Sequence, residues 1–215
     1  MYMSFFKRLI DFCLIFLFLP FLIPTYMVVA LLVKIKLGSP ILFKQSRPGL
    51  KGKVFILYKF RTMTNHNIKK DHVVDDNHRL SKFGNFLRSS SLDEIPSLWS
   101  VLKGDMTLVG PRPLLTDYLP FYSVKQARRH EVKPGITGWA QINGRNAISW
   151  EEKFELDLWY VDNCSLWLDI KILLKTIIKV ISREGVSPRD QVIMPRFDDI
   201  MKKRNYKKNE NSSNF

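Results

Sequence analysis

The stretch that decides the fold is FCLIFLFLPFLIPTYMVVALLV at residues 12–33, which contains no charged residue. An apolar run of about 20 residues is long enough to cross a bilayer as a helix. Two prolines, Pro20 and Pro24, lie inside it. Proline lacks the backbone N–H and clashes with the carbonyl four residues earlier, so two prolines one turn apart predict a pronounced break. The sequence therefore predicts a helix-break-helix segment at the membrane, within residues 1–36.

Basic residues flank this apolar run on both sides. Lys7 and Arg8 precede it, and Lys34 and Lys36 follow it. Because cytoplasmic flanks of membrane segments are enriched in lysine and arginine, both ends are expected on the cytoplasmic side. The segment is then a re-entrant hairpin that dips into one leaflet and returns. A kinked helix that spans the bilayer is the alternative, and the segment alone leaves both open.

The composition of the whole chain limits the classes of partner and of site. The 215 residues are 46% hydrophobic and 25% charged, as in a globular chain of one domain plus attachments. The net charge of +14 indicates an anionic partner: nucleic acid, an acidic membrane surface or a phosphorylated substrate. Two distant cysteines exclude a disulfide framework, and the histidines form no ligand cluster. A metal is therefore expected to be a hard cation held by carboxylates and phosphate.

The composition changes abruptly after the membrane segment. Short β-like runs at residues 41–45 and 54–61 enclose a basic, turn-rich loop and predict a β-hairpin. In the second run Lys59 and Arg61 alternate with aromatic residues, which predicts one cationic and one apolar face. A short helix is expected over residues 80–87. The predicted fold class is α/β, mostly helical with a small β-hairpin, in a monotopic membrane protein.

A second amphipathic segment lies near the end of the chain, at residues 168–181. Its lysines recur every four residues, apolar residues cover most of the remaining circumference, and Trp159 and Trp167 precede it. This pattern is typical of an interfacial helix in the membrane plane. A core helix with a solvated lysine edge fits equally well. We expect a central domain over residues 37–190 and a basic, flexible tail over residues 191–215.

The segment SLDEIPSLWSVLKG at residues 91–104 has the pattern of a helix. Ser91 and Glu94 form a potential capping box, and Gly104 can end the helix in a left-handed conformation. Asp93 in the first turn would then only complement the helix dipole. The same first turn also suits an anionic phosphoryl group. Capping and chemistry are compatible, since Ser91 can cap while Asp93 reacts.

Several loops concentrate groups suited to phosphate or sugar. Arg88 lies upstream of the acidic pair, and Pro111-Arg112-Pro113 holds one guanidinium in a rigid turn. Gln141, Asn143 and Arg145 place several donors on an expected loop. The alternative readings are a solvated surface turn and a turn satisfied by its own backbone. The chain contains neither a P-loop nor a dinucleotide-binding fingerprint.

Six separated motifs carry a family resemblance. The chain resembles the small monotopic phosphoglycosyl transferases of the bacterial sugar transferase family, from residue 7 to about residue 187. The stretch Gly144–Trp150 is most similar to enzymes that load N,N′-diacetylbacillosamine phosphate at the start of bacterial protein glycosylation. The motifs are Gln45-Ser-Arg-Pro-Gly49, Tyr58-Lys-Phe-Arg-Thr-Met63, Leu87-Arg-Ser-Ser-Ser-Leu-Asp-Glu94, Leu102-Lys-Gly-Asp-Met106, Val109-Gly-Pro-Arg-Pro113 and Lys133-Pro-Gly-Ile-Thr-Gly138.

The resemblance implies a two-step transfer of sugar-1-phosphate from a UDP-sugar to undecaprenyl phosphate, with release of UMP. It implies that Asp93 is the nucleophile, that Asp93 and Glu94 hold Mg²⁺, and that the enzyme works at the cytoplasmic face of the bacterial inner membrane. Its partners are then the UDP-sugar, undecaprenyl phosphate and membrane lipid, and not nucleic acid. The implied substrate-binding residues are Lys59, Arg88, Pro111, Arg112, Pro113, Gln141, Asn143 and Arg145.

The sequence departs from the family at the apex of the membrane segment. A Ser-Pro pair is frequent there, whereas this chain has Ile23-Pro24, and Thr25 is the nearest substitute hydroxyl. Two other functions remain as alternatives: a membrane-bound glycosyl transferase that releases UDP, and a membrane-tethered basic protein that binds nucleic acid. No nucleic-acid-binding module is recognisable in the sequence, which disfavours the latter.

Overall fold

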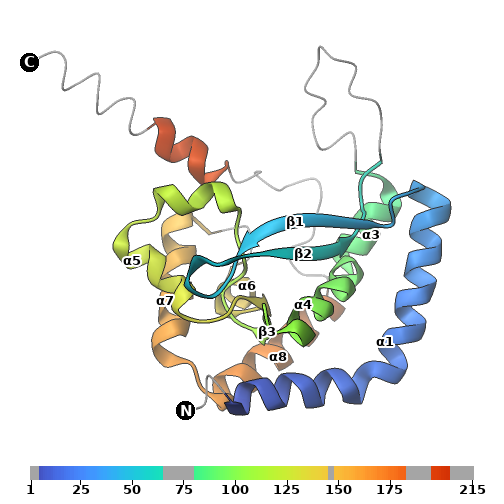
Figure 1. Cartoon of the computed structure of the whole chain (residues 1–215), viewed down its shortest axis with the longest axis horizontal. Helices are drawn as coiled ribbons and strands as arrows, with labels where there is room; N and C mark the ends of the chain where they lie inside the picture. The colour runs from blue at the N-terminus through green and yellow to red at the C-terminus, as the bar shows by residue number, and fades with distance from the viewer. Residues whose placement is uncertain (1–4, 65–79, 145–147, 183–194, 204–215) are drawn as a thin grey trace, which may run out of the picture.

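The computed structural model describes residues 5–64, 80–144, 148–182 and 195–203 (Figure 1). Most of these residues are helical, with a β-hairpin and a second small sheet, as the sequence predicts. The first element, α1 (Lys7–Leu37), is long and apolar enough to cross a membrane by length and composition. Figure 1 shows that α1 bends, so that a first arm runs along the lower edge of the molecule and a second arm rises beside it.

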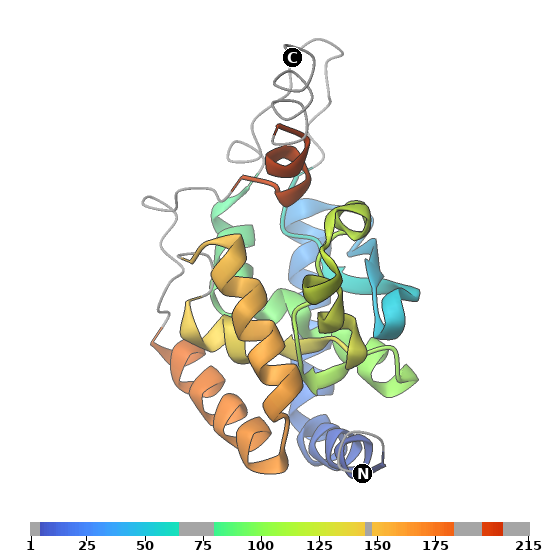
Figure 2. The same ribbon diagram turned by 90° about the vertical axis from the view of Figure 1, so that its left-hand side faces the viewer.

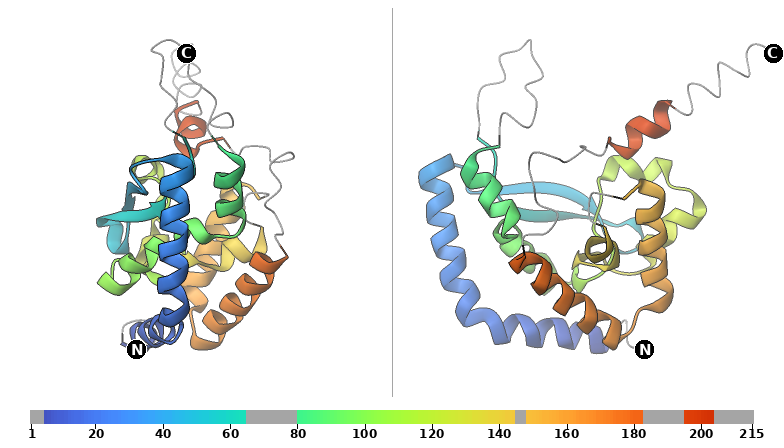
Figure 3. Two further views of the ribbon diagram at one scale, coloured as in Figure 1. Left: turned by 90° about the vertical axis from the view of Figure 1, so that its right-hand side faces the viewer. Right: turned by 180° about the vertical axis from the view of Figure 1, so that it is seen from behind.

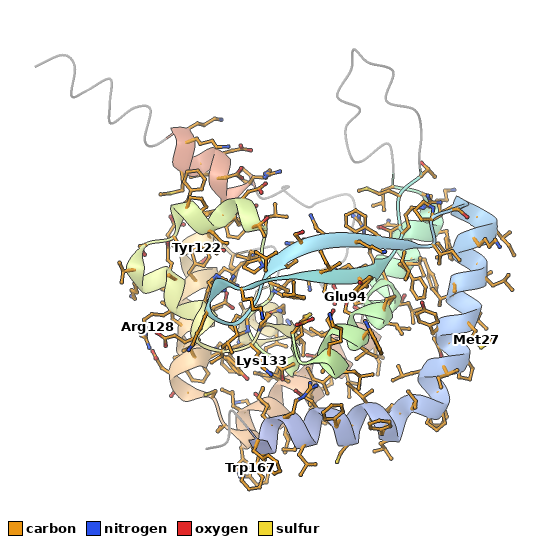
Figure 4. All side chains as sticks on the ribbon, in the orientation of Figure 1. Met27, Glu94, Tyr122, Arg128, Lys133 and Trp167 are labelled. Carbon is orange, nitrogen blue, oxygen red and sulfur yellow. The ribbon has the colours of Figure 1, made fainter. Side chains whose placement is uncertain are left out.

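The bend keeps both arms of α1 on the rest of the protein. Pro20 and Pro24 lie inside the helix, which continues through them, and Met27 is on the second arm (Figure 4). Ile15 of the first arm packs with Phe55 in one buried cluster, while Val33 of the second arm packs in another. The prolines therefore lie in a bent helix rather than between two separate helices. The Thr25 hydroxyl donates to the carbonyl of Phe21.

The predicted hairpin is confirmed. Strands β1 (Leu42–Pro48) and β2 (Val54–Phe60) pair antiparallel around the short 3₁₀ turn η2 (Leu50–Gly52). The prediction of a cationic face on β2 is wrong. Side chains two residues apart on a strand share a face, so Lys59 lies on the same face as the buried residues Phe55 and Leu57. Arg61 donates instead to the carbonyls of Leu37 and Ser39, next to the end of α1.

A run of short helices follows the hairpin. It comprises α3 (Lys82–Ser89), the 3₁₀ helix η3 (Leu92–Ser97) and α4 (Leu98–Lys103), which ends at Gly104 in the predicted left-handed conformation. The predicted capping box of Ser91 and Glu94 does not form. Ser91 adopts a left-handed conformation with φ of 57°, and its side chain makes no capping hydrogen bond. Ser90 and Ser91 separate α3 from η3, and the left-handed backbone of Ser91 redirects the chain between these two helices.

A small parallel sheet holds the second half of the domain together. Strands β3 (Thr107–Val109) and β4 (Gly135–Thr137) pair, with η4 (Thr116–Phe121), α5 (Val124–Ala127) and η5 (Arg128–Glu131) between them in sequence. Helices α6 (Trp139–Asn143), α7 (Trp150–Asn163) and α8 (Leu166–Ile181) then cover the sheet, with α7 and α8 side by side in Figure 2. Val109, Tyr160 and Ile172 meet in the core that these elements share.

Helix α8 has apolar residues on two opposite sides, one buried and one exposed. Leu168 and Ile172 are buried in the core, whereas its opposite side exposes large apolar residues. The exposed side consists of Leu174, Ile177, Ile178 and Ile181. Trp167 is 80% exposed, and the first arm of α1 lies at the same end of the molecule (Figures 3 and 4). An apolar, aromatic surface thus gathers at one end of the molecule.

Part of the segment predicted as a tail packs against the domain. Residues 197–203 are helical, and Phe197 is buried against Tyr118 and Trp150. Arg196 pairs with Asp117 at 2.8 Å. These contacts place residues 195–203 with the central domain.

Candidate active site

The acidic pair lies at the start of η3, directly beneath β2, and Figure 4 shows Glu94 near the centre of the molecule. Asp93 is 7% exposed. Lys59 from β2 reaches both carboxylates, with its Nζ 2.6 Å from Glu94 Oε1 and 3.9 Å from Asp93 Oδ2. The hydroxyl of Ser97 donates to the Tyr58 carbonyl at 2.8 Å and ties η3 to the strand. Lys59, which the sequence analysis names as a substrate-binding residue, thus lies beside the acidic pair.

Glu94 forms ion pairs with two cationic side chains, Lys59 and Arg112. Arg112 Nη2 donates to the same oxygen, Glu94 Oε1, at 2.7 Å. Burial raises the pKa of Glu94, but the charges and hydrogen bonds of Arg112 and Lys59 outweigh burial and bring this pKa to about 2. Burial and the charge of Arg112 lower the pKa of Lys59. Glu94 is therefore an ionised carboxylate that forms ion pairs with two cationic side chains.

Asp93 is bound differently from its neighbour. It accepts no hydrogen bond from the described part of the chain, and its cation contact is the longer one to Lys59. Burial raises the pKa of Asp93, and the charges of Lys59, Arg112 and Arg88 offset this increase only in part. A buried carboxylate without hydrogen-bond donors keeps its electron pairs available, as a nucleophile requires.

Three hydrogen bonds fix the Pro111-Arg112-Pro113 turn. Each of its three carbonyls accepts one from a different part of the fold. The Gly135 amide donates to Pro111 at 3.0 Å, Arg129 to Arg112 at 2.7 Å, and Arg47 to Pro113 at 3.2 Å. A Cβ atom on Gly135 would lie 2.1 Å from the Gly110 amide nitrogen, so only glycine allows this approach. The turn is therefore not a solvated surface loop.

Arg129 forms a buried ion pair with Asp157 of α7. The two side chains are each 2% exposed and lie 2.7 Å apart. Removing either partner would leave a buried charge uncompensated. This ion pair thus orients the carbonyl side of the turn and, through it, Arg112. No sequence pattern predicts this pair, because both residues lie at ordinary charged positions.

A pocket opens beside the acidic pair, between the hairpin and the β3–β4 sheet. Four of its residues, Arg47, Met106, Gly135 and Ile136, belong to motifs of the resemblance but were not predicted as site residues. The lining consists of Arg47, Leu57, Lys59, Glu94, Ser97, Met106, Arg112, Pro113, Gly135 and Ile136. The polar rim and apolar floor suit a phosphorylated ligand with some apolar surface.

The remaining predicted residues are dispersed. Arg88 donates from Nε to Thr62 Oγ1 at 3.0 Å, and its charge lowers the pKa of Asp93. Gln141 and Asn143 lie on α6 rather than on a loop, and neither lines the pocket. Asn143 donates to the carbonyl of Trp139. Arg145 lies outside the described residues.

The donor set fits Mg²⁺. Within the described ranges, no group of three or more metal-ligating side chains forms a closed site. Mg²⁺ commonly keeps several waters and binds through one or two carboxylates plus substrate phosphates. Asp93 and Glu94 supply two adjacent carboxylates beside the pocket, which matches this open kind of site.

The chain is similar to known proteins over most of its length. A family model described as bacterial sugar transferase matches residues 2–183. The uncharacterized sugar transferase EpsL of Bacillus subtilis is 63% identical over 165 residues, which cover 77% of this chain and 82% of EpsL.

Longer relatives match with one part of their length. The UDP-glucose:undecaprenyl-phosphate glucose-1-phosphate transferase of Escherichia coli is 40% identical over 185 residues, covering 80% of this chain and 39% of the relative. The undecaprenyl-phosphate galactose phosphotransferase of Salmonella typhimurium is 39% identical over 165 residues, covering 69% and 35%. The chain thus spans most of EpsL and less than half of these longer relatives.

Proposed function

The chain belongs to the bacterial sugar transferase family, and we propose that it is a phosphoglycosyl transferase that moves a sugar-1-phosphate from a UDP-sugar to undecaprenyl phosphate. Relatives whose names state this type of reaction with glucose or galactose support the general reaction. The net charge of +14 suits two phosphorylated substrates. The protein is associated with the membrane through α1.

The contrast between Asp93 and Glu94 carries the assignment of roles. Asp93 attacks the sugar-linked phosphorus, the bond from that phosphorus to the bridging oxygen breaks, and UMP leaves with the electron pair. A phosphate oxygen of the polyprenol then attacks the aspartyl-linked phosphorus, and Asp93 is released. Glu94 is less suited to the role of Asp93, because Lys59 and Arg112 both bind its Oε1 oxygen and draw charge from the carboxylate.

The cations of the site reduce the repulsion between a carboxylate and a diphosphate. Lys59 and Arg112 lie beside both acidic residues and can stabilise charge on the transferring phosphoryl group. When bound by Asp93 and Glu94, Mg²⁺ would neutralise further phosphate charge. Residues of this chain alone position the nucleophile, since η3 is tied to β2 through Ser97 and Lys59.

Contacts at both arms of α1 support a re-entrant placement. Lys7 is buried and pairs with Asp169 of α8, and Asp11 accepts from Thr107 Oγ1 at 2.6 Å. At the other end Val33 packs against the same globular part. A straight spanning helix would pull its first arm away and leave buried charges unpaired. Together with the basic flanks of α1, these contacts support a position of the domain at the cytoplasmic face of the inner membrane.

A narrower resemblance supports a proposal for the class of sugar. The stretch Gly144–Trp150 favours an N-acetylated amino sugar such as diacetylbacillosamine, and hence a role at the start of protein glycan assembly. Glucose and galactose are the competing sugars, because relatives are named for them.

A nucleotide-release assay tests the proposal. The protein in detergent or nanodiscs is incubated with undecaprenyl phosphate and a panel of UDP-glucose, UDP-galactose and UDP-linked N-acetylated amino sugars. We expect release of UMP with one class of sugar. Release of UDP would indicate direct glycosyl transfer, and binding of nucleic acid without any turnover would support the other alternative.

Arg112→Ala is expected to lower kcat/KM for the UDP-sugar roughly 10- to 100-fold, because a charge-assisted phosphate contact is lost. Membrane attachment should not change, since Arg112 lies far in sequence from α1 and contacts Glu94. Arg128→Ala is the matched control, since Arg128 is similarly exposed and lies in surface ion pairs. Equal rates for Arg112→Ala and the unaltered protein at limiting UDP-sugar would refute the role.

Replacing both Pro20 and Pro24 with leucine is expected to straighten α1 and separate one arm from the domain. Transfer to a full-length polyprenol phosphate should then fall more than formation of the aspartyl intermediate from soluble UDP-sugar. The measurement is the ratio of these two rates, with Phe21→Leu as a control that keeps both prolines. An unchanged ratio, or labelling of a cysteine at position 4 from the periplasmic side in the unaltered chain, would argue against the re-entrant placement.

A further inference from the structure

Arg47 is a charged pocket residue that the proposed mechanism leaves unused. It lies near the end of β1 and, by its pairing with Phe55, faces the interior of the domain. Its guanidinium lines the same pocket as Lys59, Glu94 and Arg112. Of the cations that line this pocket, Lys59 and Arg112 each form an ion pair with Glu94.

The guanidinium of Arg47 has no carboxylate partner among the described residues. It donates to two neutral acceptors, the Pro113 carbonyl at 3.2 Å and Gln45 Oε1 at 2.6 Å, while its Nε is buried without a partner. Burial and the nearby charge of Arg112 lower the pKa of Arg47 to about 10. Buried charges in proteins are normally paired. A half-buried arginine that faces a second arginine across a pocket is therefore suited to an anionic ligand.

The arrangement of charges indicates which part of a diphosphate would reach Arg47. Lys59 and Arg112 form ion pairs with Glu94 at 2.6 Å and 2.7 Å. Among the described residues Arg47 forms no such pair with Asp93 or Glu94, and it donates instead to the carbonyl of Pro113, the residue after Arg112. Arg47 therefore lies beside the Arg112 turn rather than beside the acidic pair. A diphosphate with its sugar-linked phosphorus at Asp93 would extend past Arg112 toward Arg47.

We propose that Arg47, together with Arg112, binds the nucleotide-side phosphate of the UDP-sugar and stabilises it as the leaving group. This inference rests on the proposed function. As Asp93 attacks, the bridging oxygen takes the bonding electron pair and charge accumulates on the phosphate of UMP. A guanidinium can meet that phosphate with two parallel N–H donors. Once UMP has left, Arg47 has no part in the attack by the polyprenol phosphate.

The alternative is a purely structural role, in which Arg47 only supports the turn through the Pro113 carbonyl. A displaced turn would misplace Arg112, which serves the transferring phosphoryl group in both halves of the reaction. A structural role therefore predicts that both half-reactions slow together. The leaving-group role predicts that only the first half-reaction slows.

The test compares Arg47→Gln with the unaltered protein in separate half-reactions. We expect intermediate formation from UDP-sugar to slow roughly 10- to 100-fold, and the inhibition constant of UMP to rise by a similar factor. Discharge of a preformed intermediate by polyprenol phosphate should stay within about two-fold. Arg47→Lys should recover part of the loss, because it keeps the charge but not the paired donors.

The matched control is Lys44→Gln, which removes one positive charge from the exposed side of the same strand. It should leave both half-reactions unchanged, whereas equal losses in Lys44→Gln and Arg47→Gln would reduce the effect to general charge attraction. Slowing of both half-reactions, or of discharge alone, would overturn the leaving-group role. If the unaltered protein forms no intermediate with any UDP-sugar and releases no UMP, the proposed function fails instead.

Discussion

Asp93→Asn abolishes formation of the covalent intermediate and release of UMP, and the protein keeps its fold: this is the expected result with the largest effect. An amide is isosteric with the carboxylate but is not a nucleophile, so the rate should fall by about 10³-fold or more. The measurement is UMP release together with mass spectrometry of the protein after incubation with UDP-sugar.

The stability of this variant makes the result interpretable. Burial raises the pKa of Asp93, so the folded state binds its proton more tightly than the unfolded chain does. Stability contributed by this group is thus greatest at low pH and falls as pH rises through the folded-state pKa. In metal-free buffer at neutral pH, removing the charge should leave the melting temperature equal or higher. Asp162→Asn, in an exposed ion pair, is the control. Substantial turnover by Asp93→Asn would assign the nucleophile elsewhere.

Glu94→Gln has the opposite signature, in that it should reduce both activity and stability. The folded-state pKa of about 2 lies below the ordinary value of 4.5. The ionised group therefore stabilises the fold above pH 4.5, and this contribution is lost as pH falls toward 2. A difference of that size corresponds to about 3 kcal/mol at neutral pH, as an upper estimate for a side chain 17% exposed. Activity should fall as well, because Lys59 and Arg112 lose their common partner.

Urea unfolding with a chelator present, at pH 7 and at pH 3, measures this effect without a metal contribution. The destabilisation relative to the unaltered protein should be smaller at pH 3. Glu131→Gln is the matched control, because Glu131 pairs with Arg128 at an exposed position and such pairs contribute little. A Glu94→Gln protein of normal stability would show that the two cations do not need this carboxylate.

The sequence predicted the local elements well, because their signals are local. The hairpin, the helix near residues 80–87 and the end at Gly104 each follow from periodicity or turn chemistry within a few residues. The capping-box prediction was wrong because it, too, used only local sequence. Ser91 and Glu94 have the right spacing, but Glu94 bonds instead to Lys59 and Arg112, which are 35 and 18 residues away. Charge-assisted bonds to distant cations are stronger than a bond to a neighbouring amide.

The site was predicted as a set of residue types rather than as a geometry. Asp93, Glu94, Lys59 and Arg112 lie together, and the resemblance was needed to choose them. The pair of Arg129 with Asp157 was missed, because nothing in the neighbouring sequence distinguishes these residues from solvated ones. Arg47 lies in the motif Gln45–Gly49, but the motif alone did not indicate that its side chain lines the pocket. Gln141 and Asn143 were overvalued, because a glycine-rich sequence suggested a loop where α6 forms.

The buried contact between Lys7 and Asp169 has a consequence for biosynthesis. The two residues are 162 positions apart, so α1 leaves the ribosome long before its partner on α8 exists. At about 5–20 residues per second, the interval is roughly 8–32 s. Throughout that interval the first arm of α1 has no buried carboxylate to receive its ammonium group, which stays hydrated at the membrane surface. The nascent helix reaches its final seat only when the last part of the domain is made, so the order of synthesis makes α1 the first element to be produced and among the last to be secured.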